Sequence, residues 1–229
     1  FIYYFPMKKK YLIFGATGSI GSSLANQMYE EKQDCHLIGR NEEELKKLAN
    51  KLNYSFSVCD VLTLDFTKKL LTELSNTEIL GIAYCVGSID LKPLRIASED
   101  DFNNCMKLNF YSAINLIKSY QENLKKNKGS IVLFSTVAAQ RGFSNHSIIA
   151  STKAALEGLT VSLAAEFAPN IRVNCVALSL TNSKIAQPML KNKAMAEGIA
   201  KAHPLKRIGE GKDGASLAKF LLTEESSWI

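Results

Sequence analysis

The stretch that decides the fold is "YLIFGATGSIG", residues 11–21. Its apolar beginning predicts a buried strand, and Gly15, Gly18 and Gly21 follow on the way into a helical pattern. The first glycine permits a tight turn, the second lets the backbone approach a pyrophosphate, and the third lets the helix pack on the strand. The helix N-terminus adds amide donors for an anion. A purely structural turn is the alternative, but strand, turn and helix in this order favour a dinucleotide site.

Short apolar runs alternate with longer amphipathic runs along the rest of the chain. Because near-continuous apolar strands alternate with helices, we expect a single α/β, doubly wound, Rossmann-type parallel sheet with helices on both faces. Asn41 is expected to cap one helix, and Ser98 with Asp101 to form a capping box. Further strands are predicted at 35–39, 55–59, 79–86, 130–135 and 171–177, and helices at 42–52, 66–74, 98–126, 149–167 and 214–222.

The composition predicts one globular domain over residues 7–229, because 229 residues with 46% hydrophobic content suit a single core. Residues 1–6 precede a natural-looking start at Met7 and are expected to be a leader or a remnant outside the domain. No run of 18 uncharged apolar residues occurs, so no membrane span is expected. The five scattered cysteines favour free thiols in the cytoplasm.

The net charge of +6 comes from lysines dispersed among glutamates and asparagines. Such dispersal is typical of solvated helix faces, so nucleic acid is not expected as a partner. A few of these positive charges are better explained by the binding of a phosphate-bearing cofactor.

The end of the second strand bears on the choice of cofactor. A carboxylate there would bind the adenosine ribose and favour NAD, but the chain has Gly39, Arg40 and Asn41. Arg40 could pair with a 2′-phosphate, which favours NADP(H) over NAD(H). The alternative is a solvent-facing arginine before a helix.

From about Lys10 to its last residue, the chain resembles the short-chain dehydrogenase/reductases. The glycine turn fits their GxxxGxG pattern with Ser19 at the middle glycine, and Asp60-Val61 resembles their adenine-contacting pair. "YCVG", residues 84–87, occupies the place of Asn-Asn-Ala-Gly. The resemblance implies cofactor contacts from Gly15, Thr17, Gly18, Ser19, Ile20, Gly21, Arg40, Asn41, Asp60, Val61, Cys85, Val86, Gly87, Asn109, Lys153 and Thr181.

The resemblance also implies catalytic roles for Asn109, Ser135, Thr136 and Lys153. Thr136 stands at the spacing of the family's serine, and the family's lysine also holds the nicotinamide ribose. However, Ile149 stands where the family has its catalytic tyrosine. That tyrosine protonates the alkoxide that hydride transfer produces, and isoleucine has no proton to give.

Few residues could replace the tyrosine as the proton donor. Ser135 and Thr136 can donate hydrogen bonds, Ser147 and Ser151 lie nearby, and His146 titrates in a useful range. The position of His146, three residues before Ile149, favours a surface or capping histidine, and a catalytic one is the alternative.

Two functions follow. The first is an NADPH-dependent oxidoreductase that reduces a carbonyl or related group of a small-molecule substrate with an atypical proton donor. The alternative is a catalytically impaired NADP(H)-binding regulatory or scaffold protein. We also expect a homodimer or homotetramer built on the helices near 103–126 and 150–167, and either a lid or a packed surface helix over residues 182–204. The family's last strand is expected to be missing.

Overall fold

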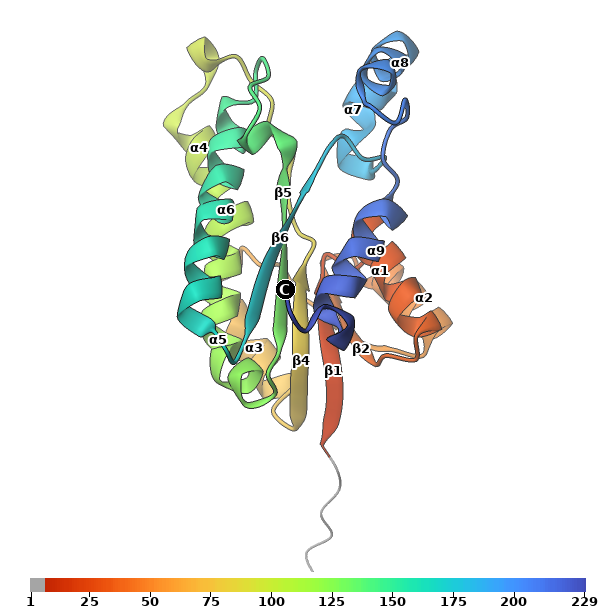
Figure 1. Cartoon of the computed structure of the whole chain (residues 1–229), viewed down its shortest axis with the longest axis vertical. Helices are drawn as coiled ribbons and strands as arrows, with labels where there is room; N and C mark the ends of the chain where they lie inside the picture. The colour runs from red at the N-terminus through yellow and green to blue at the C-terminus, as the bar shows by residue number, and fades with distance from the viewer. Residues whose placement is uncertain (1–6) are drawn as a thin grey trace, which may run out of the picture.

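The protein folds around one parallel sheet of six strands (Figure 1). The computed structural model describes residues 7–229, and the expected leader, residues 1–6, lies outside the described residues. The strand order is β3-β2-β1-β4-β5-β6, which confirms the doubly wound arrangement. The strands are β1 (Lys8–Phe14), β2 (Cys35–Gly39), β3 (Ser55–Val58), β4 (Thr77–Tyr84), β5 (Ser130–Thr136) and β6 (Arg172–Leu178). Within residues 7–229 the seventh strand of the family is missing, as the sequence predicts.

Helices cover both faces of the sheet (Figure 1). One face carries α1 (Ser19–Glu30), α2 (Glu42–Leu52) and α9 (Gly211–Leu222), and the other carries α3 (Phe66–Glu73), α5 (Ser112–Lys126) and α6 (Ser147–Phe167). Two arms rise beyond the ends of β4 to β6. One contains α4 (Glu99–Met106), and the other contains α7 (Gln187–Leu190) and α8 (Lys193–Ala202).

The strands β1, β2, β4, β5 and β6 contribute side chains to two separate cores, one on each face of the sheet. On β1, Leu12 and Phe14 join the core under α3, α5 and α6, whereas Tyr11 and Ile13 join the core under α1, α2 and α9. Since successive strand residues point to opposite faces, a strand covered on both sides must be apolar throughout. Each fully buried leucine or phenylalanine contributes roughly 1.5–3 kcal/mol to stability.

Several local predictions are confirmed. The Asn41 side chain accepts a hydrogen bond from the Glu44 backbone N–H at 3.0 Å, and Ser98 and Asp101 form the capping box. The predicted helix at 98–126 is divided by a π-helical turn over Lys107–Tyr111. There the Asn109 side-chain amide donates to the Cys105 carbonyl at 3.0 Å, so a side chain uses an acceptor of the helix ladder.

The helix α6 is, within residues 7–229, the one helix with the length and apolar composition of a membrane span. It packs along β5 and β6, however, and its residue Leu156 belongs to the core of the sheet. Packing on the sheet therefore accounts for the buried third of this segment.

The close contact between α1 and β1 generates a stability prediction. A Cβ at Gly21 would lie 2.3 Å from the Gly15 carbonyl oxygen, so Gly21→Ala forces the backbone apart. We expect a loss of roughly 1–3 kcal/mol or more in the free energy of unfolding, measured by denaturant titration. The control is Gly198→Ala in α8, where nothing lies within 4 Å of the added Cβ. Equal stability of the two variants would contradict the packing role of Gly21.

Candidate active site

A cleft of about 960 Å³ opens at the carboxyl ends of the strands, next to the point where the strand order reverses between β1 and β4. Cofactors bind at such switch points in doubly wound sheets, and the volume suits a bound ligand. Gly21 and Asn109 do not line the cleft, but the other predicted site residues do: Gly15, Thr17, Gly18, Ser19, Ile20, Arg40, Asn41, Asp60, Val61, Cys85, Val86, Gly87, Ser135, Thr136, Lys153 and Thr181.

The glycine turn has the geometry that a pyrophosphate requires. Gly15 adopts φ +71°, and a Cβ there would lie 2.8 Å from the Cys85 carbonyl oxygen. Gly18 is the N-cap of α1, whose first turn contains no acidic residue to repel a phosphate. The turn therefore fits a dinucleotide, whereas Gly21 serves the packing of α1 behind it.

The expected adenosine end of the cleft is lined by Arg40, Asn41 and Asp60. One oxygen of Asp60 accepts a hydrogen bond from the Leu62 N–H at 2.9 Å. Glu44 also lines this end, but Lys184, which follows β6, forms an ion pair with it. Sequence reasoning missed this pair because the two residues are 140 positions apart.

Lys153 lies at the other end of the cleft, on α6. Its ammonium donates a hydrogen bond to the Phe134 carbonyl at 2.8 Å, and a Cβ at Gly87 would lie 3.5 Å from its Nζ. The missing side chain of Gly87 thus keeps the space beside the ammonium open. Burial lowers the pKa of Lys153 from 10.5 to about 8.

Asn109 supports the wall of the cleft from behind. It is fully buried, its amide donates to Ser88 Oγ at 3.0 Å, and its Oδ1 accepts from the Ser88 N–H at 3.3 Å. Ser88 lines the cleft and donates its own proton to Asp90. Asn109 is therefore placed to position the loop after β4.

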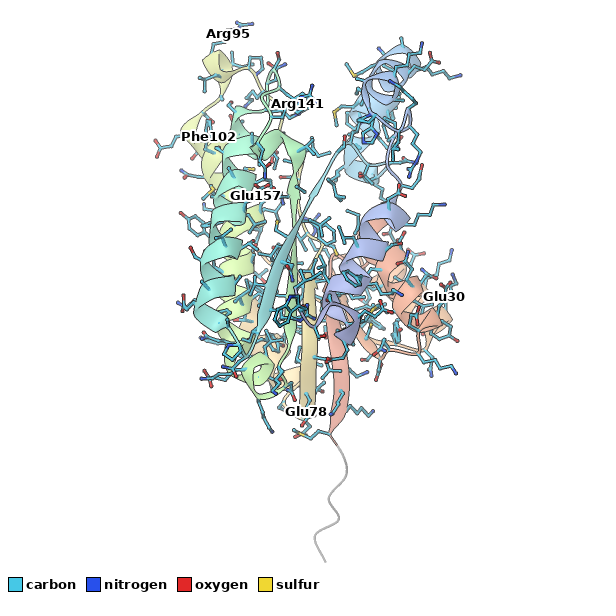
Figure 2. The ribbon with its side chains drawn as sticks, viewed as in Figure 1. Glu30, Glu78, Arg95, Phe102, Arg141 and Glu157 are labelled. Carbon is cyan, nitrogen blue, oxygen red and sulfur yellow. The ribbon has the colours of Figure 1, made fainter. Side chains whose placement is uncertain are left out.

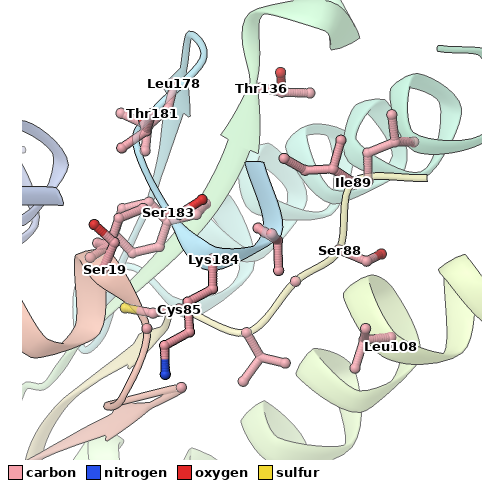
Figure 3. Close-up of a pocket in the computed structure, with 18 of the residues that line it drawn as sticks. Ser19, Cys85, Ser88, Ile89, Leu108, Thr136, Leu178, Thr181, Ser183 and Lys184 are labelled. Atoms are coloured by element: carbon pink, nitrogen blue, oxygen red, sulfur yellow. The ribbon is translucent and has the colours of Figure 1, made fainter. Parts of the chain in front are cut away.

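The two hydroxyl groups at the end of β5 differ in what they can donate. Ser135 is buried and donates to Glu157 Oε1 at 2.6 Å, so its proton is committed. The Thr136 hydroxyl oxygen accepts from the Ala138 N–H at 3.2 Å, which leaves its proton free. Figure 3 shows Thr136 at the cleft wall. Of the two, Thr136 is the one that can donate to a ligand.

Ile149 is 4% exposed and lines the cleft where the family has tyrosine. His146 lines it too, although its sequence position favours a surface or capping role. Ile149 and Lys153 are four residues apart and share one face of α6, and His146 is the N-cap residue before that helix. Among residues 7–229, no tyrosine lines the cleft. The nearby Tyr84 instead bonds Ser112 and the Leu108 carbonyl.

The segment after β6 forms part of the cleft wall. Ser183, Lys184, Ile185, Met189 and Ile199 line the cleft, which favours the lid interpretation over a packed surface helix. Ser19 Oγ donates to the Asn182 carbonyl at 2.7 Å, so the segment is joined to the glycine turn. Figure 3 shows Ser183 and Lys184 on this segment, beside Ser19 and Cys85.

Comparisons with known proteins agree with this geometry. A family model described as enoyl-(acyl carrier protein) reductase matches residues 15–229. A tropinone reductase homolog of Arabidopsis thaliana is 34% identical, over 96% of this chain and 88% of its own length. The 3-oxoacyl-[acyl-carrier-protein] reductase of Rickettsia prowazekii is 30% identical, over 96% of this chain and 92% of its own length. A solved structure of a short chain dehydrogenase/reductase family protein superposes with a TM-score of 0.88 at 25% identity, covering 98% of this chain and 94% of its own.

The chain therefore belongs to the short-chain dehydrogenase/reductase family. The family consists of NAD(P)-dependent oxidoreductases that act on alcohol or carbonyl groups, and the chain is an oxidoreductase of this class.

The buried ammonium of Lys153 leads to a pH prediction. Because its native pKa of about 8 lies below the ordinary 10.5, the buried charge destabilises the fold below pH 8, and this cost disappears as the pH rises from 8 to 10.5. The free energy of unfolding of Lys153→Met relative to the parent protein should therefore fall by about 3 kcal/mol as the pH rises from 7 to 10.5. Denaturant titrations of both proteins across this range measure it.

The control is Lys47→Met on the exposed face of α2, which should leave stability unchanged at every pH. A constant difference between Lys153→Met and the parent protein would contradict a depressed lysine pKa.

Proposed function

We propose that the protein is an NADPH-dependent reductase of a carbonyl or related group on a small molecule. The observation that carries this proposal is that one cleft holds a phosphate-compatible glycine turn, Arg40 near one end, and Lys153 with Thr136 at the other. The relatives support the choice of a carbonyl, since both a tropinone reductase homolog and a 3-oxoacyl-[acyl-carrier-protein] reductase are named for ketone reduction.

The chain's own residues have separable tasks in this reaction. A bound nicotinamide cofactor would supply the hydride. Lys153 would hold the nicotinamide ribose through the donors that Phe134 does not use. Thr136 would donate a hydrogen bond to the substrate oxygen as negative charge develops on it. Ser135, whose proton goes to Glu157, is a positioning residue, and so is Asn109 behind Ser88.

The preference for NADPH rests on the end of β2. Arg40 and Asn41 line the cleft, and Glu44, which also lines this end, is paired with Lys184. A 2′-phosphate at this end would meet an arginine, and the Lys184 ammonium offsets the charge of Glu44. A charged hydrogen bond of this kind contributes about 1.5–3 kcal/mol.

The alternative is an NADP(H)-binding regulatory or scaffold protein with impaired catalysis. Ile149 favours it, because an apolar side chain fills the position from which the family donates a proton. Both functions use the same cofactor cleft, so turnover decides between them.

Cofactor choice is tested by Arg40→Ala. We expect the KM for NADPH to rise by about 10-fold or more, because a charged partner of the 2′-phosphate is lost, while the KM for NADH stays unchanged. Steady-state oxidation of each cofactor with a panel of ketones, 3-oxoacyl thioesters and enoyl thioesters measures this. Lys47→Ala on α2, the helix that follows Arg40, is the control.

Two outcomes would count against the proposed reductase. An equal rise in the KM for NADPH and in the KM for NADH would show that Arg40 does not bind the 2′-phosphate. Tight NADPH binding without oxidation of NADPH by any substrate of the panel would favour the regulatory protein.

We further propose a cytoplasmic homodimer or homotetramer that pairs α5 and α6. The outer surface of these helices exposes apolar side chains, including Val161 on α6 and Tyr111 just before α5. Obligate interfaces between copies are apolar in this way.

Val161→Asp tests this assembly. Val161 is 72% exposed in the single chain, so a buried charge between copies should lower the mass measured by light scattering to that of the monomer. Leu64→Asp, at a residue that is 93% exposed before α3, is the control and should leave the mass unchanged. A monomeric parent protein would refute the proposal.

A further inference from the structure

The end of the cleft around Ile149 contains a second titratable group, His146. It lies one helical turn before Ile149, at the N-cap of α6, and lines the cleft together with Thr136 and Ile149. His146 is the N-cap residue, with φ −98° and ψ 6°, and it lines the same cleft as Ile149, the residue at the position of the family's tyrosine.

The imidazole is held in one orientation. His146 Nδ1 lies 2.7 Å from the Ser144 carbonyl oxygen, which can only accept, so Nδ1 carries a proton. The centroid of the Phe143 ring lies 5.4 Å from the centroid of the imidazole ring. The Lys92 N–H donates a hydrogen bond to the carbonyl of Asn145, the residue before His146, at 2.9 Å. With Nδ1 occupied, Nε2 is the ring nitrogen left to accept or release a proton.

Two hydroxyl groups at this end have their protons in hydrogen bonds, since Ser135 donates to Glu157 and Ser88 donates to Asp90. The Lys153 ammonium donates one hydrogen bond to the Phe134 carbonyl, and the proposed reductase uses its other donors for the nicotinamide ribose. Thr136 has a free proton, but an aliphatic hydroxyl is a weak acid. An imidazolium, in contrast, is a common general acid in enzymes.

We propose that His146 replaces the missing tyrosine as the proton donor of this site. The proposal rests on the proposed reductase function. The carbonyl carbon accepts the hydride of NADPH, and the π electron pair moves onto the carbonyl oxygen. That oxygen then takes the proton from Nε2 of the imidazolium, whose N–H electron pair stays on Nε2. The neutral ring keeps its Nδ1–H and regains a proton from solvent, so each turnover consumes one NADPH and one proton.

The tautomer is tested first, without cofactor or substrate. In ¹⁵N-labelled protein, neutral His146 should carry its proton on Nδ1. His203 provides an internal contrast, because the Leu205 N–H donates to its Nδ1 at 3.2 Å and so places its proton on Nε2. Opposite tautomers for the two histidines are the expected result. A proton on Nε2 of neutral His146 would overturn the proposal whatever the activity.

The catalytic role is tested by His146→Gln and His146→Ala. Both should lower kcat with the best ketone of the panel by about 10²-fold or more and change the Kd for NADPH by less than twofold, since a general acid contributes 10²–10⁴ in rate. Imidazole added to the buffer should restore part of the turnover of His146→Ala. His203→Gln, which does not border the cleft, should behave as the parent protein.

The outcomes separate this proposal from the one on which it rests. Unchanged kcat in His146→Gln would overturn the role of His146 and leave the reductase function intact. Equal loss in both variants without imidazole rescue would show a structural role for the ring and also overturn it. Absence of turnover in the parent protein, with NADPH bound, would remove the reductase function and the donor role together.

Discussion

The pairing of β1 with both β2 and β4 is the constraint on which the rest of the structure depends. From β1 the chain builds outward to β2 and β3 on one side, and to β4, β5 and β6 on the other. The connections that follow β1 and β4 therefore run away from each other, one toward β2 and the other toward β5. The carboxyl ends of β1 and β4 stay uncovered between these two connections. A Cβ at Gly15 would lie 2.8 Å from the Cys85 carbonyl, so the two strand ends meet with room for a glycine and no larger residue. The cofactor cleft is thus a consequence of strand order and of one close backbone approach.

The buried charge of Lys153 in this cleft lowers the stability of the fold. Lys153 is a charged group enclosed by the sheet and by α6, with a carbonyl as its one hydrogen-bond acceptor, and a buried ammonium is stable only when its donors are used. A ribose hydroxyl would satisfy a donor that the protein leaves free. The same residue therefore opposes folding and favours cofactor binding, as is common where an active site needs a buried charge.

Much of the fold and part of the site could be predicted because they depend on local patterns. The glycine spacing at 15, 18 and 21, the cap at Asn41 and the capping box at Ser98 all act within a few residues, and the structure has each of them. The Glu44–Lys184 pair and the Ser135–Glu157 bond could not be predicted, since they join distant elements whose relative positions arise only from packing. The burial of Asn109 away from the cleft is of the same kind.

Ile149 has no proton to donate, but its side chain has a structural role. Its side chain is almost fully buried and packs with Cys105 and Ile148 in a small separate core. That core joins α6 to α4. The proposed donor, His146, lines the same cleft with its Nδ1 bonded to the Ser144 carbonyl, so this proposal leaves Ile149 to serve packing alone.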